Sequence, residues 1–362
     1  MKKVLVFGIT ENPGGVESLI MNYYREIDKR LIQFDFLCNT EVVAYEDEIT
    51  SLGGGIFRIP ARRDGRTKFE KTLNSFMEKY APNYQAIWVN VCSLANIDYL
   101  KYAKKYGIEK RIIHCHNAEN GDSFLRGLLH KINRLTVRKY ATDFWTCSDA
   151  AVNWFFGPSI RKLESYRLIH NAIDLEKYQY RENIRQEYRE KLGLQDKRVI
   201  GHIGRFHFQK NHKYLIEVFQ KVLQKEPSSC LLLVGQGELM GEVKRRVKEL
   251  RMEEQVLFLG IRQDIDKLYQ AMDCFVLPSI FEGVPLVGIE AQAAGLPCIF
   301  SDSITQELKI GENIKFLSLN NEQLWVHEII NAFYVDRVDN LKVLKDKGYD
   351  IKKECEQIAK LF

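Results

Sequence analysis

Two glutamates stand out in the stretch SIFEGVPLVGIEAQAAGLP, residues 279–297, because nearly every neighbour is apolar or small. Pro285 suits the first turn of a helix, which puts Glu282 just before that helix and Glu290 in its second turn. The helix dipole alone would explain Glu282, but a carboxylate among apolar residues, as at Glu290, is costly unless it binds something. Carboxylates accept hydrogen bonds from adjacent hydroxyls, so the pair suits a polyhydroxylated ligand such as a ribose and a sugar.

A second segment whose residues could take part in chemistry is GHIGRFHFQKNH, residues 201–212. Gly204 ends an expected strand, Arg205 follows it, and Lys210 precedes a helix expected from about residue 212. Arginine can bind a diphosphate in bidentate fashion, lysine acts as a point charge, and a helix N-terminus adds free N–H groups. Two solvated loop cations are the alternative, and the position directly after a strand favours the diphosphate site.

Two further glycine-bearing turns follow expected strands. In GITENPGGVESLI, Gly14 and Gly15 would let a ligand approach the backbone at the start of a helix. In LVGQGELMGEV, Gly235 ends a strand and Glu238 is expected to open a helix. The first turn does not match GxGxxG, so dinucleotide binding is poorly supported. Each turn taken alone is also explained as a tight strand-to-helix connection.

Short apolar runs alternate with longer amphipathic ones, which indicates parallel, doubly wound sheets. A charge-dense stretch at 174–198 separates two such series, so we predict two Rossmann-like α/β domains, 1–180 and 181–340, followed by a C-terminal helix within 341–362 that crosses back to the N-terminal domain. The expected strands are 3–9, 34–38, 56–60, 86–90, 111–116, 143–148, 166–173, 199–206, 230–237, 256–261, 274–279, 297–301 and 314–319.

The overall composition excludes several classes of protein. The net charge of +5 over 362 residues is too weakly basic to indicate nucleic-acid binding, yet it suits an anionic ligand or membrane surface. The eight cysteines include no CxxC pair and are expected as buried free thiols in a reducing cytoplasm. The start MKKVLVFGIT indicates a first strand rather than a signal peptide, and no apolar run approaches the roughly 18 residues that span a membrane.

The segments GRFHFQKNH, LVGQGEL, FLGIRQDI and DCFVLPSIFEGVPLVGIEAQAAGLP together resemble the C-terminal domain of family 4 retaining glycosyltransferases of the GT-B fold, of the bacterial surface-polysaccharide type. GGVES and HNAID also match, although Ala172 stands where the family usually has glycine. The resemblance implies that the two domains face each other across a cleft. It also implies that the N-terminal domain binds the acceptor and the C-terminal domain binds the nucleotide sugar.

The resemblance also implies roles for single residues. Arg205 and Lys210 would stabilise the diphosphate, Glu282 would lie near the donor sugar, and His116 near the reacting sugar and acceptor; these four are the expected catalytic residues. Among the expected binding residues, Glu290 would hold the ribose. The expected substrate-binding residues are Gly14, Gly15, Gly204, Gly235, Ile261, Arg262, Gly283, Val284, Pro285, Leu286 and Glu290.

The activity implied by the resemblance is transfer of a hexosyl group, with retention, from a nucleotide sugar that is expected to be UDP-linked. The acceptor would be a polysaccharide or lipid-linked saccharide in capsule or exopolysaccharide synthesis, in the cytoplasm or peripherally at the inner face of the plasma membrane. No metal, other cofactor or enzymic nucleophile is expected, because paired cations can stabilise the leaving group. The DID motif at 264–266 resembles a metal motif, but Asp264 is expected to cap a helix. A nucleotide-sugar epimerase and a catalytically silent partner subunit stay open as alternatives.

One segment, SFLRGLLHKINRLTVRKY at residues 123–140, suits a membrane surface. It has an apolar stripe at helical spacing and five cations without any acid, and residues 58–68 add five more cations. A core-facing helix with a solvated basic face is the alternative. The stripe consists of Leu125, Leu128, Leu129, Ile132 and Leu135, and the cations are Arg126, Lys131, Arg134, Arg138 and Lys139.

Overall fold

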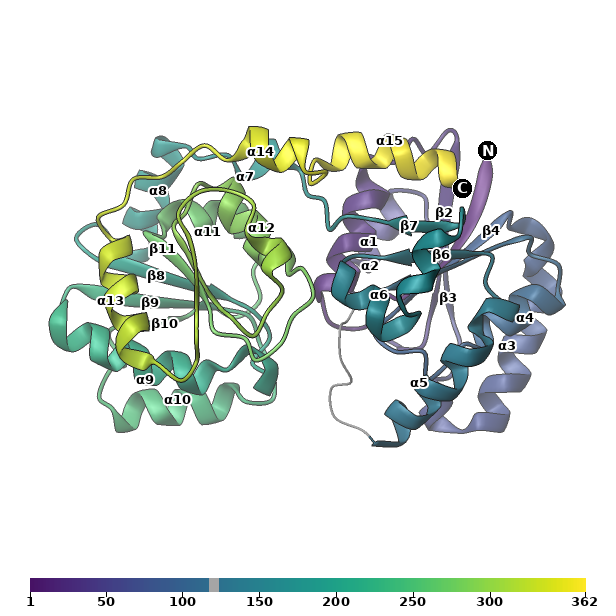
Figure 1. The fold of residues 1–362 in the computed structure, drawn as a ribbon, viewed down its shortest axis with the longest axis horizontal. Helices are drawn as coiled ribbons and strands as arrows, with labels where there is room; N and C mark the ends of the chain where they lie inside the picture. Colours follow the sequence, from purple (N-terminus) through teal and green to yellow (C-terminus); the bar gives the residue numbers. More distant parts are fainter. Residues whose placement is uncertain (117–123) are drawn as a thin grey trace. The chain divides into compact units, whose positions relative to one another are not determined.

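The computed structural model describes residues 1–116 and 124–362, and the chain divides into two units. Unit 1 comprises residues 1–172 and 351–362, and unit 2 comprises residues 173–350 (Figure 1). The charge-dense stretch 174–198 thus belongs to unit 2, and the chain returns to unit 1 at its C-terminal end.

Within the described residues of unit 1, seven strands form a parallel sheet in the order β3-β2-β1-β4-β5-β6-β7. All seven strands were predicted from the sequence. Every residue of β2 is buried, as a parallel strand with helices on both faces requires. The strands are β1 Lys2–Phe7, β2 Ile32–Cys38, β3 Ile56–Arg58, β4 Ala86–Val91, β5 Lys110–Cys115, β6 Asp143–Thr146 and β7 Tyr166–Leu168.

Helices cover both faces of the unit 1 sheet. One face packs against α3 Arg66–Tyr80, α4 Asp98–Lys105 and α6 Asp149–Phe155, which share one apolar core with the strands. The other face packs against α1 Gly15–Glu26 and α15 Ile351–Leu361, and Phe362 lies 5.7 Å from the rings of both Trp88 and Trp145. The remaining helices are α2 Glu46–Ser51 and α5 Phe124–Thr136.

Unit 2 repeats this plan with a six-stranded parallel sheet in the order β10-β9-β8-β11-β12-β13. The strands are β8 Arg198–Ile203, β9 Ser229–Val234, β10 Val256–Phe258, β11 Cys274–Leu277, β12 Cys298–Ser301 and β13 Ile314–Leu317. One face carries α9 His212–Lys225, α10 Met240–Glu249 and α13 Glu322–Ala332, and the other carries α7 Leu175–Tyr178, α8 Glu182–Leu192, α11 Ile265–Ala271, α12 Leu286–Ala293 and α14 Leu341–Asp346 (Figure 1). The predicted fold class, two Rossmann-like α/β domains, is confirmed.

The strand order shows where each unit should bind a ligand. In each sheet the order reverses between two neighbouring strands, β1 and β4 in unit 1 and β8 and β11 in unit 2. The chain leaves one strand of such a pair toward one face of the sheet and leaves the other strand toward the opposite face, which opens a crevice between the two connections. Doubly wound sheets bind ligands in this crevice, beyond the carboxyl ends of the two strands. In unit 2 those ends lead directly into the predicted segments around Arg205 and Glu282.

Gly235 is required at the end of β9 by a close approach between two turns. Its φ is +130°, and a Cβ built there would lie 2.2 Å from the carbonyl oxygen of Gly204. Its N–H donates to the carbonyl of Gly260 at 2.8 Å. The turn after β9 therefore supports the turn after β8, and a side chain at Gly235 would push the two apart.

We expect Gly235→Ala to lower the free energy of unfolding by at least about 2 kcal/mol, because both the strained φ and the overlap with Gly204 must be relieved. Urea unfolding of the purified variant measures this loss. Gly241→Ala is the matched control: it lies on α10, where a Cβ meets nothing within 4 Å, so it should be neutral or stabilising by up to about 1 kcal/mol. Equal losses in the two variants would contradict the close-approach argument.

Two further features of the described chain are the state of its cysteines and the character of its helices. All eight cysteines lie at described positions and are free thiols, seven of them buried. Among residues 1–116 and 124–362, no helix has the length and apolar character that crossing a membrane requires.

Candidate functional site

Lys210 lies over the turn that follows β8. Gly204 continues the strand by donating its N–H to the carbonyl of Val234 at 2.9 Å, and Lys210 ends a short 3₁₀ turn, Phe208–Lys210, just before α9. A Cβ on Gly204 would lie 3.0 Å from both Cδ and Cε of Lys210. Glycine at this position therefore leaves room for the lysine stem, which brings the ammonium group to the point where the strand order reverses.

Glu282 meets that ammonium from the neighbouring strand. Lys210 Nζ lies 2.6 Å from Glu282 Oε1, and the two side chains are only 15% and 11% exposed. Gln209 holds the two loops together. Its backbone carbonyl accepts from the N–H of Ile280, and its side-chain amide donates to the carbonyl of Phe281, both at 2.8 Å. Glu282 is thus more than an acid near a helix start, since its carboxylate forms a largely buried ion pair.

Arg205 reaches out from the same turn. Its side chain is 59% exposed and donates to Glu238 Oε2 at 3.1 Å, and His207 Nε2 lies 3.6 Å from the other oxygen of that carboxylate. The prediction that Glu238 opens a helix is wrong, because α10 begins two residues later, at Met240, and Glu238 lies in the preceding turn. An exposed ion pair contributes little free energy, so the guanidinium can turn to an anionic ligand.

Glu290 is buried on α12 and lies in its second turn, as predicted. The hydroxyl of Tyr178 donates to Oε1 at 2.9 Å, and that of Tyr269 lies 3.0 Å from Oε2. Burial raises the pKa of Glu290, and the two tyrosine hydrogen bonds partly offset that rise. Because each carboxylate oxygen can accept two hydrogen bonds, the tyrosines orient the group and leave acceptor capacity for ligand hydroxyls.

The loop before α12 is held by its own side chains. Val284 and Leu286 are 3% and 6% exposed, and Pro285 is the N-cap residue directly before the helix. These buried side chains hold the loop that follows Glu282, and the role of its N–H groups toward a sugar and a phosphate stays a prediction.

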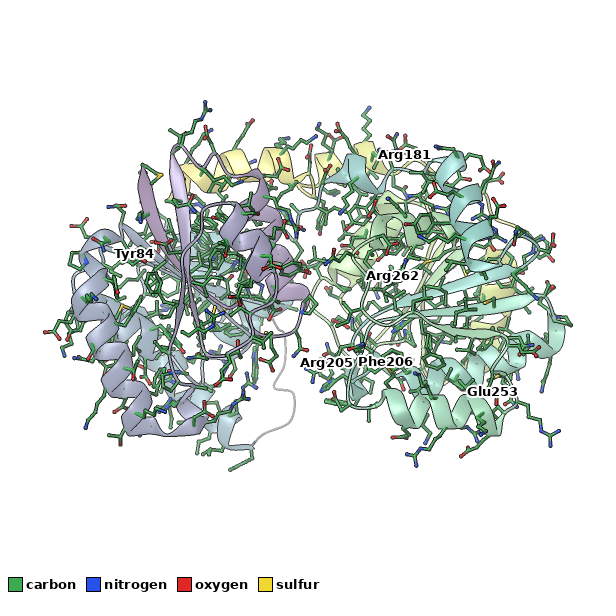
Figure 2. The ribbon with its side chains drawn as sticks, turned by 180° about the vertical axis from the view of Figure 1, so that it is seen from behind. Tyr84, Arg181, Arg205, Phe206, Glu253 and Arg262 are labelled. Carbon is green, nitrogen blue, oxygen red and sulfur yellow. The ribbon has the colours of Figure 1, made fainter. Side chains whose placement is uncertain are left out.

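The turn after β10 contains an apolar and a charged residue. Ile261 is 53% exposed, whereas the guanidinium of Arg262 donates to both carboxylate oxygens of Asp264, at 2.8 and 2.6 Å. These hydrogen bonds hold the pKa of Asp264 well below its usual range. Asp264 occupies the N-cap position of α11, but its side chain accepts no capping hydrogen bond there and pairs with Arg262 instead. Figure 2 shows Arg205 and Arg262 toward one edge of unit 2 and Glu253 toward the opposite edge.

In unit 1, the two predicted glycines begin α1. Gly14 is the N-cap residue, and Gly15 is the first helical residue, where a Cβ would meet nothing within 4 Å. Neither packing nor backbone conformation therefore requires glycine at position 15, and its small size leaves space in front of the helix. Glu17 in the first turn is buried and accepts from the hydroxyl of Thr10 at 2.6 Å, and burial raises its pKa.

His116 follows β5 and is held by Asn90. Its Nε2 lies 3.0 Å from Asn90 Oδ1, and the amide nitrogen of Asn90 donates to the carbonyl of Phe7. The Asn90 oxygen therefore accepts, which puts the imidazole proton on Nε2. Burial lowers the pKa of His116 to about 3, so the ring is neutral at physiological pH and offers hydrogen bonding rather than charge.

The contacts of unit 2 join Gly204, Lys210, Glu282 and Gly235 into one cluster, with Arg205 on the same turn. Glu290 belongs to a separate group with Tyr178 and Tyr269.

The sequence did not reveal those tyrosines, Gln209 or Asn90, because each acts on a partner distant in the chain. Gly14, Gly15 and His116 belong to unit 1. Among the described residues, no group of three or more His, Cys, Asp and Glu is placed to hold a metal ion.

Comparisons with known proteins show relatives in sequence and in fold. Residues 184–333 match the family model described as glycosyl transferases group 1. The chain is 32% identical over 371 aligned positions to the Bacillus subtilis protein named "Putative glycosyltransferase EpsF", covering 100% of this chain and 96% of the relative. It is also 32% identical over 207 positions, 54% of this chain and 53% of the relative, to the Escherichia coli UDP-Gal:alpha-D-GlcNAc-diphosphoundecaprenol alpha-1,3-galactosyltransferase. The structure of Anabaena Alr3699/HepE in complex with UDP and glucose matches with a TM-score of 0.81, at 19% identity, over 100% of this chain and 99% of that one.

Proposed function

The chain belongs to the glycosyl transferases group 1 and has the GT-B fold, and we propose that it moves a hexosyl group, with retention, from a UDP-linked sugar to a lipid-linked saccharide. As a member of this family it is a glycosyltransferase. The nucleotide, the stereochemistry and the acceptor are our proposal, which rests on the cluster around Lys210 in unit 2.

The observation that carries the proposal is the Lys210–Glu282 ion pair beyond β8 and β11. Cleavage of the bond between the anomeric carbon and the diphosphate oxygen leaves negative charge on that oxygen. A preorganised cation in a largely buried site stabilises such charge well. Lys210 would supply this charge, with the exposed Arg205 beside it as a second cation. When the ammonium turns to the diphosphate, Glu282 is released to accept hydrogen bonds from the hydroxyls of the sugar.

The nucleoside end of the donor is assigned to Glu290 and Ile261. The oriented carboxylate of Glu290 suits the two hydroxyls of a ribose, and the exposed side chain of Ile261 offers an apolar surface to the base. A UDP donor is supported by the E. coli relative, whose name specifies UDP-Gal, and by the Anabaena structure, which holds UDP and glucose.

Retention is proposed to proceed by attack of the acceptor from the side that the diphosphate leaves, with a diphosphate oxygen taking the acceptor proton. The carboxylates of Glu282 and Glu290 are engaged by Lys210 and by two tyrosines, which favours binding roles over nucleophilic ones. Neutral His116 would donate a hydrogen bond near the acceptor. A lipid-linked diphosphate acceptor is supported by the name of the E. coli relative, and it would place the reaction at the inner face of the plasma membrane.

The test is release of UDP by the purified protein from a panel of UDP-hexoses, with and without undecaprenyl-diphosphate-linked saccharides and with EDTA in a parallel series. We expect release only when an acceptor is present, undiminished by EDTA, and a product whose anomeric configuration by NMR equals that of the donor. Inverted product would refute retention, and conversion of the donor without any acceptor would favour the epimerase. A protein that no uridine nucleotide stabilises against heat would refute the donor site.

A further inference from the structure

Helix α5 turns its apolar stripe away from unit 1. Phe124 is 91% exposed and Leu135 is 82% exposed, and the other members of the stripe are exposed as well, except Leu129, which is partly buried. The only side chain of the helix that is fully buried is the polar His130. The exposed apolar residues are Phe124, Leu125, Leu128, Ile132 and Leu135. A core-facing helix is therefore excluded for the described residues of this segment; residue 123 lies outside them.

The polar side of α5 fixes this orientation. His130 Nδ1 accepts from the N–H of Leu94 at 3.1 Å, so its Nε2 carries the proton and donates to the carbonyl of Trp154 at 3.2 Å. Asn133 donates to the carbonyl of Leu94 at 2.6 Å. His130 and Asn133 lie three positions apart and share one face of the helix. The helix is thus anchored through polar groups, and its opposite face consists of large apolar side chains.

The exposed apolar residues of α5 form one continuous strip along the helix. Positions 124, 128, 132 and 135 recur at intervals of three and four, so their side chains follow one another along one face of the helix. Single exposed apolar residues are common on proteins, but a contiguous strip of this kind marks a surface that binds something.

Four of the five cations in this segment are not paired with a described carboxylate. Arg134 and Arg138 donate to neutral oxygens, the carbonyl of Asn153 and the hydroxyl of Ser159, both at 3.1 Å. Lys131, Arg134, Arg138 and Lys139 form no ion pair with any described carboxylate. The helix itself contains no acid.

The basic segment 58–68 differs from α5. Arg58 pairs with Glu46, Arg62 lies 3.6 Å from Asp98, and Arg66 lies 2.7 Å from Glu70. Because carboxylates compensate these cations, the segment does not extend the basic surface in the way that the sequence suggested.

We propose that the α5 face docks on an anionic lipid surface. The α5 face is defined as the five exposed apolar residues named above together with Lys131, Arg138 and Lys139. The apolar strip enters the boundary between headgroups and acyl chains, while the long basic side chains reach the lipid phosphates. A second copy of the chain fits poorly, because a two-fold contact through this face would oppose cations with cations. The inference does not rest on the proposed function, since lipid binding requires no transfer.

The test is co-sedimentation of the full chain with vesicles of phosphatidylcholine alone and of equimolar phosphatidylcholine and phosphatidylglycerol. We expect binding to the anionic vesicles that weakens with added salt, and much weaker binding to the neutral ones. The double variant Leu128→Ser, Ile132→Ser should bind at least about tenfold more weakly. The double variant Lys131→Gln, Arg138→Gln should lose the preference for anionic lipid.

Controls separate the face from general surface properties. Leu31→Ser removes a leucine of unit 1 that is 63% exposed, more than Leu128 or Ile132. Lys225→Gln removes a cation at the end of α9, and neither variant should change binding. Light scattering during gel filtration reports the oligomeric state of each variant. The proposal fails if wild-type protein does not sediment with anionic vesicles, or if the α5 double variants bind like wild type. It also fails if wild type is a dimer that Leu128→Ser, Ile132→Ser converts to monomer without affecting lipid binding.

Discussion

We expect Lys210→Gln to lower kcat by about a thousandfold, the effect of removing one preorganised group that stabilises charge in a transition state. The ammonium of Lys210 is held over Gly204 at the point where the strand order reverses. Among the described side chains of that turn, only the exposed Arg205 carries a second permanent positive charge. The measurement is the rate of UDP release at saturating donor and acceptor. Lys210→Arg keeps the charge but not the shape of the ammonium, and we expect it to recover only part of the loss.

The ion pair with Glu282 complicates the interpretation of this single variant. Removing Lys210 leaves a largely buried carboxylate without its partner, close to where the diphosphate would bind. The double variant Lys210→Gln, Glu282→Gln removes that repulsion, so it should bind the nucleotide better than Lys210→Gln alone while its kcat stays low. Recovery of kcat in the double variant would mean that Lys210 only neutralises Glu282, which would overturn its assignment to the leaving group.

Lys221→Gln is the matched control for Lys210. Lys221 also forms an ion pair with a glutamate, Glu322, but on α9 and away from the ends of β8 and β11. We expect its kcat and its melting temperature to match those of wild type, because exposed ion pairs contribute at most about 1 kcal/mol. A comparable loss of activity in Lys221→Gln would indicate a general effect of lost ion pairs.

The fold could be predicted because its signals are local. Strands buried on both faces appear as continuous apolar runs, and every strand in the described part of the chain was anticipated from such a run. The positions of Arg205, Lys210 and Glu290 relative to their strands and helices follow from the same local reading. Glu238 was misplaced because Met240 begins α10 without a capping side chain, so the sequence offered no start signal there.

The partners of the site residues could not be predicted, because they depend on strand order. Glu282 contacts Lys210 because β11 lies beside β8 in the sheet. Tyr178 contacts Glu290 although the two residues are 112 positions apart in the sequence. Tyr178 also lies in the charge-dense stretch that resembled a boundary between domains. Part of that charge is in fact paired within unit 2, since Arg185 and Arg189 of α8 lie 2.5 and 3.3 Å from Asp273.

A second large effect is expected at Glu290, where stability and donor binding should respond in opposite directions. Glu290→Gln should weaken binding of the uridine nucleotide by about tenfold to a hundredfold, because an amide accepts fewer and weaker hydrogen bonds from ribose hydroxyls than a carboxylate. Without nucleotide, the same variant should be at least as stable as wild type at neutral pH. Calorimetric titration and thermal unfolding measure the two quantities on the same sample.

The expected stability follows from the raised pKa of Glu290. The folded protein holds this proton more tightly than the unfolded chain, whose carboxyl has a pKa near 4.5. Stability therefore falls as pH rises from 4.5 through the folded pKa, and it stays lower above that pKa. Glutamine never ionises, so Glu290→Gln avoids this loss. A variant that is clearly less stable than wild type at neutral pH would show that the carboxylate is structural and would weaken the ligand argument.

Tyr178→Phe tests the same site without removing the carboxylate. The tyrosine hydrogen bond lowers the pKa of Glu290, so its loss should raise that pKa further and move the acidic limb of kcat/KM for the donor to higher pH. Above that limb the variant should bind the donor within about tenfold of wild type. Tyr84→Phe is the control, because Tyr84 donates to the buried carboxylate of Asp35 at 3.0 Å in unit 1, where Figure 2 labels it. A pH profile for Tyr178→Phe that coincides with those of wild type and Tyr84→Phe would mean that the carboxylate of Glu290 does not bind the donor in its ionised form.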